Sequence, residues 1–258
     1  QHLDGGASPC GTADGRFDAT RWRYGPGVIT VEPVPHPDLR SLLPAERDAF
    51  VDLLGSLDEH EWAAPTECPE WTVKGVALHV LGDDLSLLAR QRDAMAPGPL
   101  LYAEGHPGVT FRGLLDGFNE QWVHAAQFLS PALIVELLRI TGGWTASFYD
   151  AVDPEKRGEP VGFFAATGPS PYWQISAREY IERWVHHHQV RRAIGRTDLG
   201  PEFLAPALEA IAFGLAAHLP DLNAAPGAAL ALVVPDVGAW VLGRAAHGPT
   251  WTVCHADP

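Results

Sequence analysis

Cysteine and lysine are both scarce in this chain of 258 residues. The three cysteines are an odd number and include no Cys-x-x-Cys pair, which argues against a disulfide framework and against a zinc site built from thiolates. Lysine and arginine together number 18 against 32 acidic residues, so the formal net charge is −14. Because nucleic-acid binding depends on clustered basic side chains, we expect a small molecule, and not a nucleic acid, as the partner.

Long apolar runs are also missing from the sequence. No stretch approaches the roughly 20 apolar residues that a membrane-spanning helix needs, and none has the basic amphipathic pattern of a helix that lies on a membrane. The N-terminal residues lack the basic-then-apolar pattern of a signal peptide. These absences predict a cytoplasmic protein without membrane contacts. The sequence also contains no P-loop, dinucleotide-binding fingerprint or Ser-His-Asp pattern.

Hydrophobic residues make up 46% of the chain, and their spacing divides it into three parts. Residues 1–37 hold Gly and Pro clusters without a sustained period, so we expect an irregular extension there. Residues 38–197 repeat apolar side chains every three or four positions, which predicts a helical bundle. Residues 198–258 combine a helix over about 202–218 with three short β-like runs, which predicts a small α/β domain. The expected bundle helices begin near Ser41, Thr72, Thr110, Ser130 and Ser176, the last with a capping box formed by Ser176 and Glu179.

The segment EYIERWVHHHQVRRAIG carries the densest chemistry of the chain. Glu182 and His186 are four residues apart, so both project from one face of a helix and can share a metal ion. His79 lies in the middle of another, otherwise apolar helix and could supply a third ligand. Such a set leaves a coordination position open, as catalytic zinc sites do. Spacing alone also allows a surface ion pair between Glu182 and His186 and a hydrogen-bonded core histidine at position 79.

Two segments resemble the signatures of a known family. ECPEWTVKGVALHVLGDD, preceded by Trp62, is similar to the first signature of the DinB-like, mycothiol-dependent maleylpyruvate isomerase family, and ERWVHHHQVRRAIG is similar to the second. The resemblance spans about residues 38–256. It implies a mainly α protein, with a DinB-like four-helix bundle followed by a small α/β C-terminal domain. Three departures stand out: Glu70 in place of the usual Gly, Gly75 in place of an acidic residue, and a short C-terminal domain.

The resemblance also implies a site and a reaction. It places a divalent metal, zinc being the expected ion, on His79, Glu182 and His186, and a mycothiol-type thiol as cofactor. The reaction would be isomerisation of a small electrophilic metabolite or transfer of sulfur to it, because a dication lowers the pKa of a thiol bound to it. Asp83 could hydrogen-bond the free ring nitrogen of His79.

Two further residues are expected to contact the cofactor, and two other functions are alternatives. Arg191 and His188 are expected to bind the cofactor, although an Arg near a helix C-terminus and a His on a solvated face need no function. No catalytic residue can be named. A metal-dependent hydrolase on the same bundle and a bundle that binds a small molecule without catalysis are the alternatives. Bundles of this family often pair through their helices, so a homodimer is allowed for.

Overall fold

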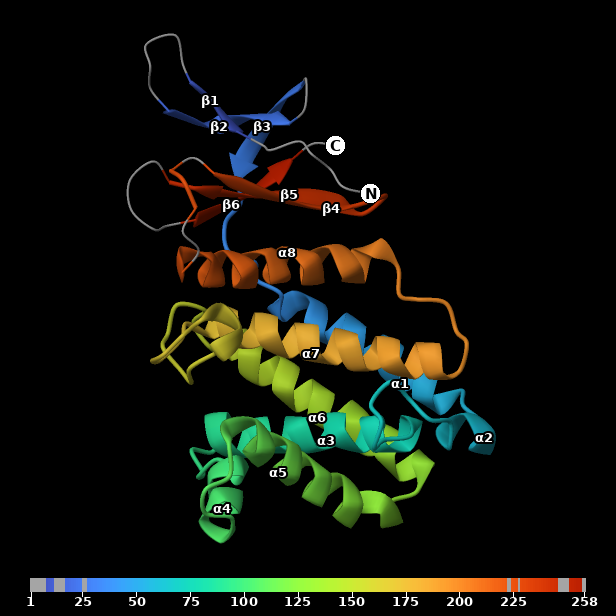
Figure 1. Ribbon diagram of the computed structural model, residues 1–258. Helices are drawn as coiled ribbons and strands as arrows, with labels where there is room; N and C mark the ends of the chain where they lie inside the picture. Colours follow the sequence, from blue (N-terminus) through green and yellow to red (C-terminus); the bar gives the residue numbers. More distant parts are fainter. Residues whose placement is uncertain are drawn as a thin grey trace.

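The chain folds into successive layers in the computed structural model, which describes residues 8–11, 17–24, 27–221, 224–226, 228–245 and 251–256. A sheet lies on one side of helix α8 (Pro201–His218), and a bundle of long helices lies on the other side (Figure 1). No helix within the described ranges is both long enough and apolar enough to cross a membrane.

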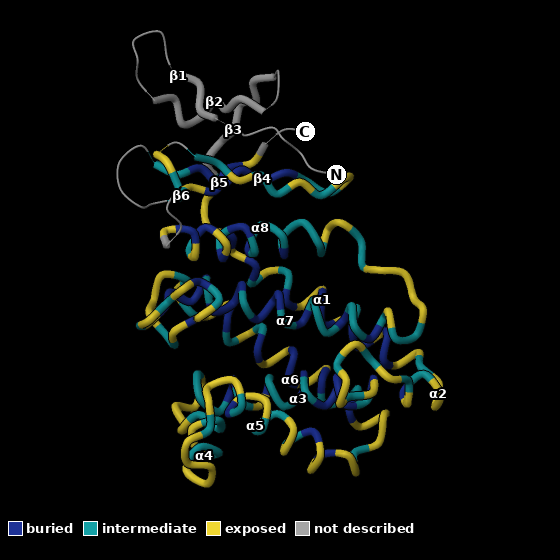
Figure 2. Tube along the Cα trace, in the orientation of Figure 1, coloured by how far each residue is buried: buried dark blue, intermediate teal, exposed yellow. Residues whose placement is uncertain are grey.

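Four long helices form the bundle: α1 (Leu43–Gly55), α3 (Val73–Leu87), α6 (Pro131–Ala151) and α7 (Tyr172–Ala193). Helices α1 and α3 each pack against both α6 and α7, and α5 (Phe111–Ala125) packs along α3. Figure 2 shows the inward turns of the bundle helices as buried, whereas much of α4 and α5 is half-buried or exposed. The mainly helical bundle is thus confirmed. Shorter helical elements join these helices: α2 (Glu59–Trp62), a π-helical turn (Leu88–Arg92), α4 (Gly98–Gly105), and 3-10 turns at Arg40–Leu42, Ala126–Phe128, Gly162–Phe164 and Leu219–Asp221.

The helix starts test the predicted caps. The side chains of Thr72, Thr110 and Ser130 each accept a hydrogen bond from a backbone N–H in the first turn, so these three caps are confirmed. The predicted capping box of Ser176 and Glu179 is wrong. Helix α7 begins four residues earlier, directly after Pro171, and both residues are buried in its interior.

The sheet is antiparallel and joins the two ends of the chain. Its order is β1-β2-β3-β6-β5-β4, in which β3 and β6 pair through Val31 opposite Ala256 and Pro33 opposite Cys254. The three C-terminal strands correspond to the three predicted β-like runs. The strands are β1 (Ser8–Gly11), β2 (Phe17–Tyr24), β3 (Gly27–Pro33), β4 (Ala229–Val234), β5 (Gly238–Arg244) and β6 (Trp251–Ala256).

The irregular extension predicted for residues 1–37 is therefore not what the structure has in its described part. Residues 8–33 hold three strands, which extend the short C-terminal sheet at the edge formed by β6. A strand that pairs with a segment more than 200 residues away leaves no local signal beyond its turns. The division into domains at residues 37 and 197 stays a prediction.

Helix α8 lies between the sheet and the bundle. On the sheet side, Ala212 and Ala216 pack with Trp240, Leu242 and Val253 in one apolar cluster. On the bundle side, small alanines of α8 join the cluster that includes residues of α7. Small side chains on both faces allow close approach, so α8 ties the sheet to the helices.

A buried ionic cluster lies at the centre of the bundle around Asp84 of α3. The Asp84 carboxylate accepts two hydrogen bonds from Arg47 of α1, at 2.6 and 2.9 Å, and one from Arg183 of α7, at 2.9 Å. The Thr141 hydroxyl of α6 donates to it at 2.6 Å. Burial alone raises the pKa of Asp84, but the charges of the two arginines and these hydrogen bonds hold that pKa below its usual value. One carboxylate thus connects all four bundle helices.

We expect Asp84→Ala to destabilise the protein strongly. The substitution leaves two buried guanidinium groups without their carboxylate, which typically costs about 3–5 kcal/mol. Urea unfolding at pH 7 measures this as a fall in the free energy of unfolding. The control is Asp48→Ala on the exposed side of the same α1 that carries Arg47, for which we expect a change within about 0.5 kcal/mol.

The effect of Asp84→Ala should also depend on pH. Because the folded-state pKa of Asp84 lies below the usual value of 3.8, its stabilisation is present above that pH and is lost as the pH falls further. The difference in free energy of unfolding between wild type and Asp84→Ala should therefore shrink below about pH 3.8. A difference that stays constant down to pH 2 to 3 would contradict this assignment.

Candidate active site

His79 and His186 come together where α3 packs against α7. Their imidazole rings lie with centroids 4.7 Å apart in an edge-to-face arrangement. Two of the three residues predicted as metal ligands are thus neighbours, although they are more than 100 positions apart in the sequence. Burial lowers the pKa of both rings, and a neutral imidazole is the form that binds a metal.

Glu182, the third predicted ligand, lies one helical turn before His186 on α7. Its Oε2 is 3.7 Å from Nε2 of His186, and its side chain is 41% exposed. Its other oxygen lies 3.6 Å from the Arg178 guanidinium. The carboxylate can therefore be reached from solvent on one side while it faces the His186 ring on the other.

Gln189 fixes the orientation of the His186 ring. Nδ1 of His186 lies 2.8 Å from Oε1 of Gln189, which also accepts a hydrogen bond from the Cys68 thiol at 3.3 Å. Because the amide oxygen only accepts, Nδ1 carries the proton, and a neutral His186 presents the lone pair of Nε2 to Glu182. A lone pair and a carboxylate then face each other with no proton between them. Sequence reasoning missed Gln189; a polar residue three positions after His186 was the available signal.

His79 is held beside Trp71. The two rings lie 4.7 Å apart, and the Trp71 indole donates to Glu120 of α5 at 2.8 Å. A Cβ on Gly75 would come within 2.8 Å of Trp71, closer than such atoms approach. The glycine found in place of the family's acidic residue therefore makes room for Trp71 beside His79.

The residues fit a metal ion in their chemistry. Two neutral imidazoles and a carboxylate are ligands that zinc and related dications accept. The separation of 3.7 Å between Nε2 of His186 and Oε2 of Glu182 is near the roughly 3.4 Å between two ligand atoms on a tetrahedral zinc ion. Within the described ranges, however, no three His, Cys, Asp or Glu side chains already converge as closely as a formed metal site requires.

Asp83 does not hydrogen-bond His79 among the described residues. It lies beside the carboxyl group of Glu179 of α7. Burial and the charge of Asp83 raise the pKa of Glu179 to about 7, against the opposing charges of Arg178 and Arg183. A second pair of α3 and α7 side chains thus lies further along the same two helices, and the sequence analysis had interpreted one of its members, Glu179, as part of a helix cap.

Arg191 and His188, the predicted cofactor-binding residues, are not brought to the His79–His186 pair. Arg191 donates to Nε2 of His187 at 3.1 Å, and Nδ1 of His187 lies 3.0 Å from the buried Glu46. His188 packs edge-to-face on Trp184, with ring centroids 4.2 Å apart. Their role in binding a cofactor stays a prediction, and Arg191 has a structural role at the end of α7.

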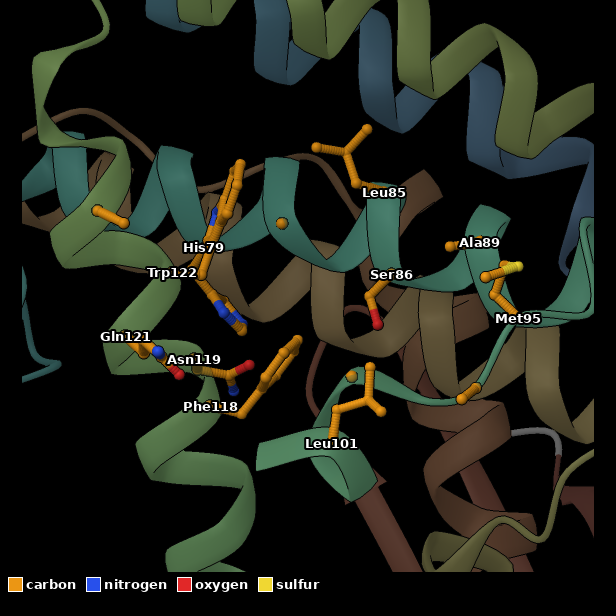
Figure 3. A pocket seen from close by; sticks show the side chains of 14 residues that line it. His79, Leu85, Ser86, Ala89, Met95, Leu101, Phe118, Asn119, Gln121 and Trp122 are labelled. Carbon is orange, nitrogen blue, oxygen red and sulfur yellow. The ribbon is translucent and has the colours of Figure 1, made fainter. Parts of the chain in front are cut away.

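A pocket of about 540 Å³ opens beside His79. It lies between α3, the π-helical turn, α4 and α5, and Figure 3 shows His79 and Trp122 toward one side of it and Met95 toward the other. The volume is in the range of small-molecule sites. The lining residues are His79, Gly82, Leu85, Ser86, Ala89, Met95, Ala96, Gly98, Leu101, Phe118, Asn119, Gln121, Trp122 and Ala125.

We expect His79 to stay neutral in the metal-free protein far below the usual pH of histidine titration. Burial is the main cause that lowers its pKa from 6.5 to about 3, and the proximity of His186 and the charge of Arg178 add to it. The unfolded chain takes up this proton near pH 6.5, so this group makes the fold less stable as the pH drops from 6.5 toward 3. Nitrogen NMR of the imidazole between pH 4 and 7 measures its protonation. A transition of the His79 signals near pH 6.5 would contradict the buried environment described above.

Comparison with known proteins supports the same fold. Two solved structures match with a TM-score of 0.52 and 0.51, both at 14% identity and covering 83% of this chain and 82% of the other. They are the mycothiol-dependent maleylpyruvate isomerase and a histidine-to-alanine mutant of it. At this identity the likeness concerns the fold. A comparison with curated protein sequences finds no match.

The family follows from a match to the sequence itself. The profile described as the mycothiol maleylpyruvate isomerase N-terminal domain matches residues 43–191. This range covers α1 to α7, includes His79, Glu182 and His186, and makes up more than half of the chain. The resemblance of the two signature segments is thereby confirmed, and the chain belongs to the mycothiol maleylpyruvate isomerase N-terminal domain family.

Proposed function

We propose that this protein is a metal-dependent enzyme that uses mycothiol or a similar small thiol to isomerise an electrophilic metabolite or to transfer sulfur to it. The observation that carries the proposal is the pair of unprotonated donors, Nε2 of His186 and the Glu182 carboxylate, 3.7 Å apart beside the neutral His79. An imidazole lone pair and a carboxylate so placed can both bind one cation. Family membership and the names of the matching structures support the thiol and the isomerase activity.

His79, Glu182 and His186 would hold the ion, with zinc as the expected metal. A dication bound there would stabilise the thiolate form of a nearby thiol at neutral pH. The protein's own residues prepare this site in three ways. Gln189 keeps the Nδ1 proton of His186 and thereby directs Nε2 toward Glu182. Trp71 and the surrounding bundle bury most of the His79 ring, so the ring stays neutral. The exposed side of Glu182 leaves a way for the thiol to reach the site.

Further properties belong to the same proposal. We expect the protein to act in the cytoplasm on a small molecule, without nucleic-acid or membrane partners, and a homodimer remains a prediction. Mycothiol is favoured over other thiols by family membership alone.

Metal content tests the ligand set. Protein purified without a metal-affinity column should hold close to one equivalent of divalent metal. His79→Ala and Glu182→Ala should each weaken the affinity for the metal at least about tenfold, because each removes one of three ligands. His60→Ala and Glu136→Ala, both exposed and distant in sequence from the site, serve as matched controls and should retain the metal. Less than about half an equivalent in wild type, unchanged in His79→Ala, would overturn the proposed site.

Thiol dependence tests the reaction class. With the metal bound, turnover of an electrophilic substrate should require added mycothiol, and thiol-free enzyme should be inactive. The reason is that the thiol sulfur, and not water, is the proposed nucleophile. Full activity in a thiol-free preparation would instead identify the metal-dependent hydrolase, in which a metal-activated water attacks.

A further inference from the structure

The pocket beside His79 has a chemical character of its own. Of the described residues that line it, none carries a charge at neutral pH, since the only titratable one is the neutral His79. The polar contributions come from Ser86, Asn119 and Gln121, and the remaining lining side chains are apolar or are glycine. Arg178 lies near both histidines but is bound to Glu179 at 2.6 Å. Apart from the proposed metal ion, this pocket therefore offers a small dicarboxylate no partner of opposite charge to replace its hydration.

The apolar walls are built into the helices that form them. The Trp122 indole donates to the backbone carbonyl of Leu78 at 2.7 Å, which fixes one wall against α3. A side chain at Gly82 would overlap the Trp122 ring, and a side chain at Gly98 would overlap Phe118. The aromatic rings thus occupy space that only glycine leaves free, so the pocket is formed before any ligand binds.

The rim of the pocket exposes apolar side chains to solvent. Leu101 is 54% exposed and Met95 is 63% exposed, and both belong to the lining. A ligand with an apolar group can cover these side chains, and their burial adds to its affinity.

We infer that this pocket binds the uncharged alkyl or aryl part of the substrate, so that the electrophile of this enzyme is a predominantly apolar compound and not a small diacid. The inference rests on the proposed function for the position of the reacting carbon, because His79 is the one proposed metal ligand among the residues that line the pocket. The substrate class that fits is an α,β-unsaturated carbonyl compound with an apolar tail. The thiol sulfur bonds to the β-carbon, the electron pair of the double bond moves toward the carbonyl, and the α-carbon takes up the thiol's proton. Rotation about the new single bond and loss of the thiol complete an isomerisation; retention of the sulfur completes a transfer.

Unreactive probes test the pocket without metal or thiol. Calorimetry with metal-free protein and the saturated ketones 2-hexanone, 2-octanone and 2-decanone should show binding that tightens about fourfold for each added CH₂. Maleate, a small dicarboxylate, should not bind the metal-free protein measurably. Binding of maleate as tight as that of 2-octanone, or ketone affinities independent of chain length, would overturn the inference.

Two neighbouring leucines of α4 give a matched pair of variants. Leu101→Arg puts a charge into the pocket and should weaken 2-octanone binding by about tenfold or more, because a buried apolar contact is replaced by a charged group. Leu100→Arg is the control, since Leu100 is similarly exposed, at 58%, but does not line the pocket. Ala89→Phe fills the cavity from the π-helical turn and should abolish binding of the longer ketones. Equal affinities in wild type, Leu101→Arg and Ala89→Phe would place ketone binding elsewhere and overturn the inference.

Turnover separates this inference from the proposed function. Metal-loaded enzyme with mycothiol should convert 3-octen-2-one with a higher kcat/KM than a short unsaturated diacid. Chain-length-dependent ketone binding without any thiol-dependent turnover would leave the pocket assignment standing and reject the proposed function. Thiol-dependent turnover that prefers the diacid would support the proposed function and reject the apolar substrate.

Discussion

The carboxylate of Asp84 holds the bundle in the register on which the site depends. It receives hydrogen bonds from Arg47 of α1, Thr141 of α6 and Arg183 of α7, while it belongs to α3 itself. Two arginines and one aspartate buried together carry a large desolvation cost, and they contribute only when their geometry is satisfied. The cluster therefore allows one arrangement of the four helices in preference to others of similar apolar packing. Asp84 follows His79 by five residues and Arg183 precedes His186 by three, so the same contact that orders the bundle sets where the two imidazoles meet.

This arrangement explains why both histidines of the site are neutral. His79 and His186 are mostly buried in the bundle, and burial favours their neutral forms. Gln189 then decides which nitrogen of His186 keeps its proton, and Nε2 is left facing Glu182. The Arg178 guanidinium lies 3.6 Å from the other oxygen of Glu182, and the two donors can together bind one further cation. A dication that binds the folded site and not the unfolded chain stabilises the fold, so metal binding and stability of this region should be linked.

Some of these features could be predicted from the sequence and others could not. Thr72, Thr110 and Ser130 act on backbone groups within their own first turn, so local sequence was sufficient for those caps. The choice of His79 as partner of His186 came from the signature segments, because helical spacing cannot tell which of two distant helices are neighbours. The strands of residues 8–33 escaped prediction since β3 pairs with β6 at the opposite end of the chain. Ser176 and Glu179 resembled a cap, but Pro171 begins the helix before them and burial takes both into the interior.

The position of His79 connects the two halves of the proposed chemistry. Its ring packs edge-to-face with that of His186 and also lines the apolar pocket. An apolar group bound against Trp122 and Phe118 would displace water from the same space that borders His79. Removal of water lowers the local dielectric constant, which strengthens the attraction between a dication and an anionic sulfur. An apolar tail would then contribute twice, through its own burial and through the thiolate it helps to stabilise. A short, hydrated diacid could do neither, which is why the lining of this pocket bears on the choice of substrate as directly as the metal ligands bear on the reaction.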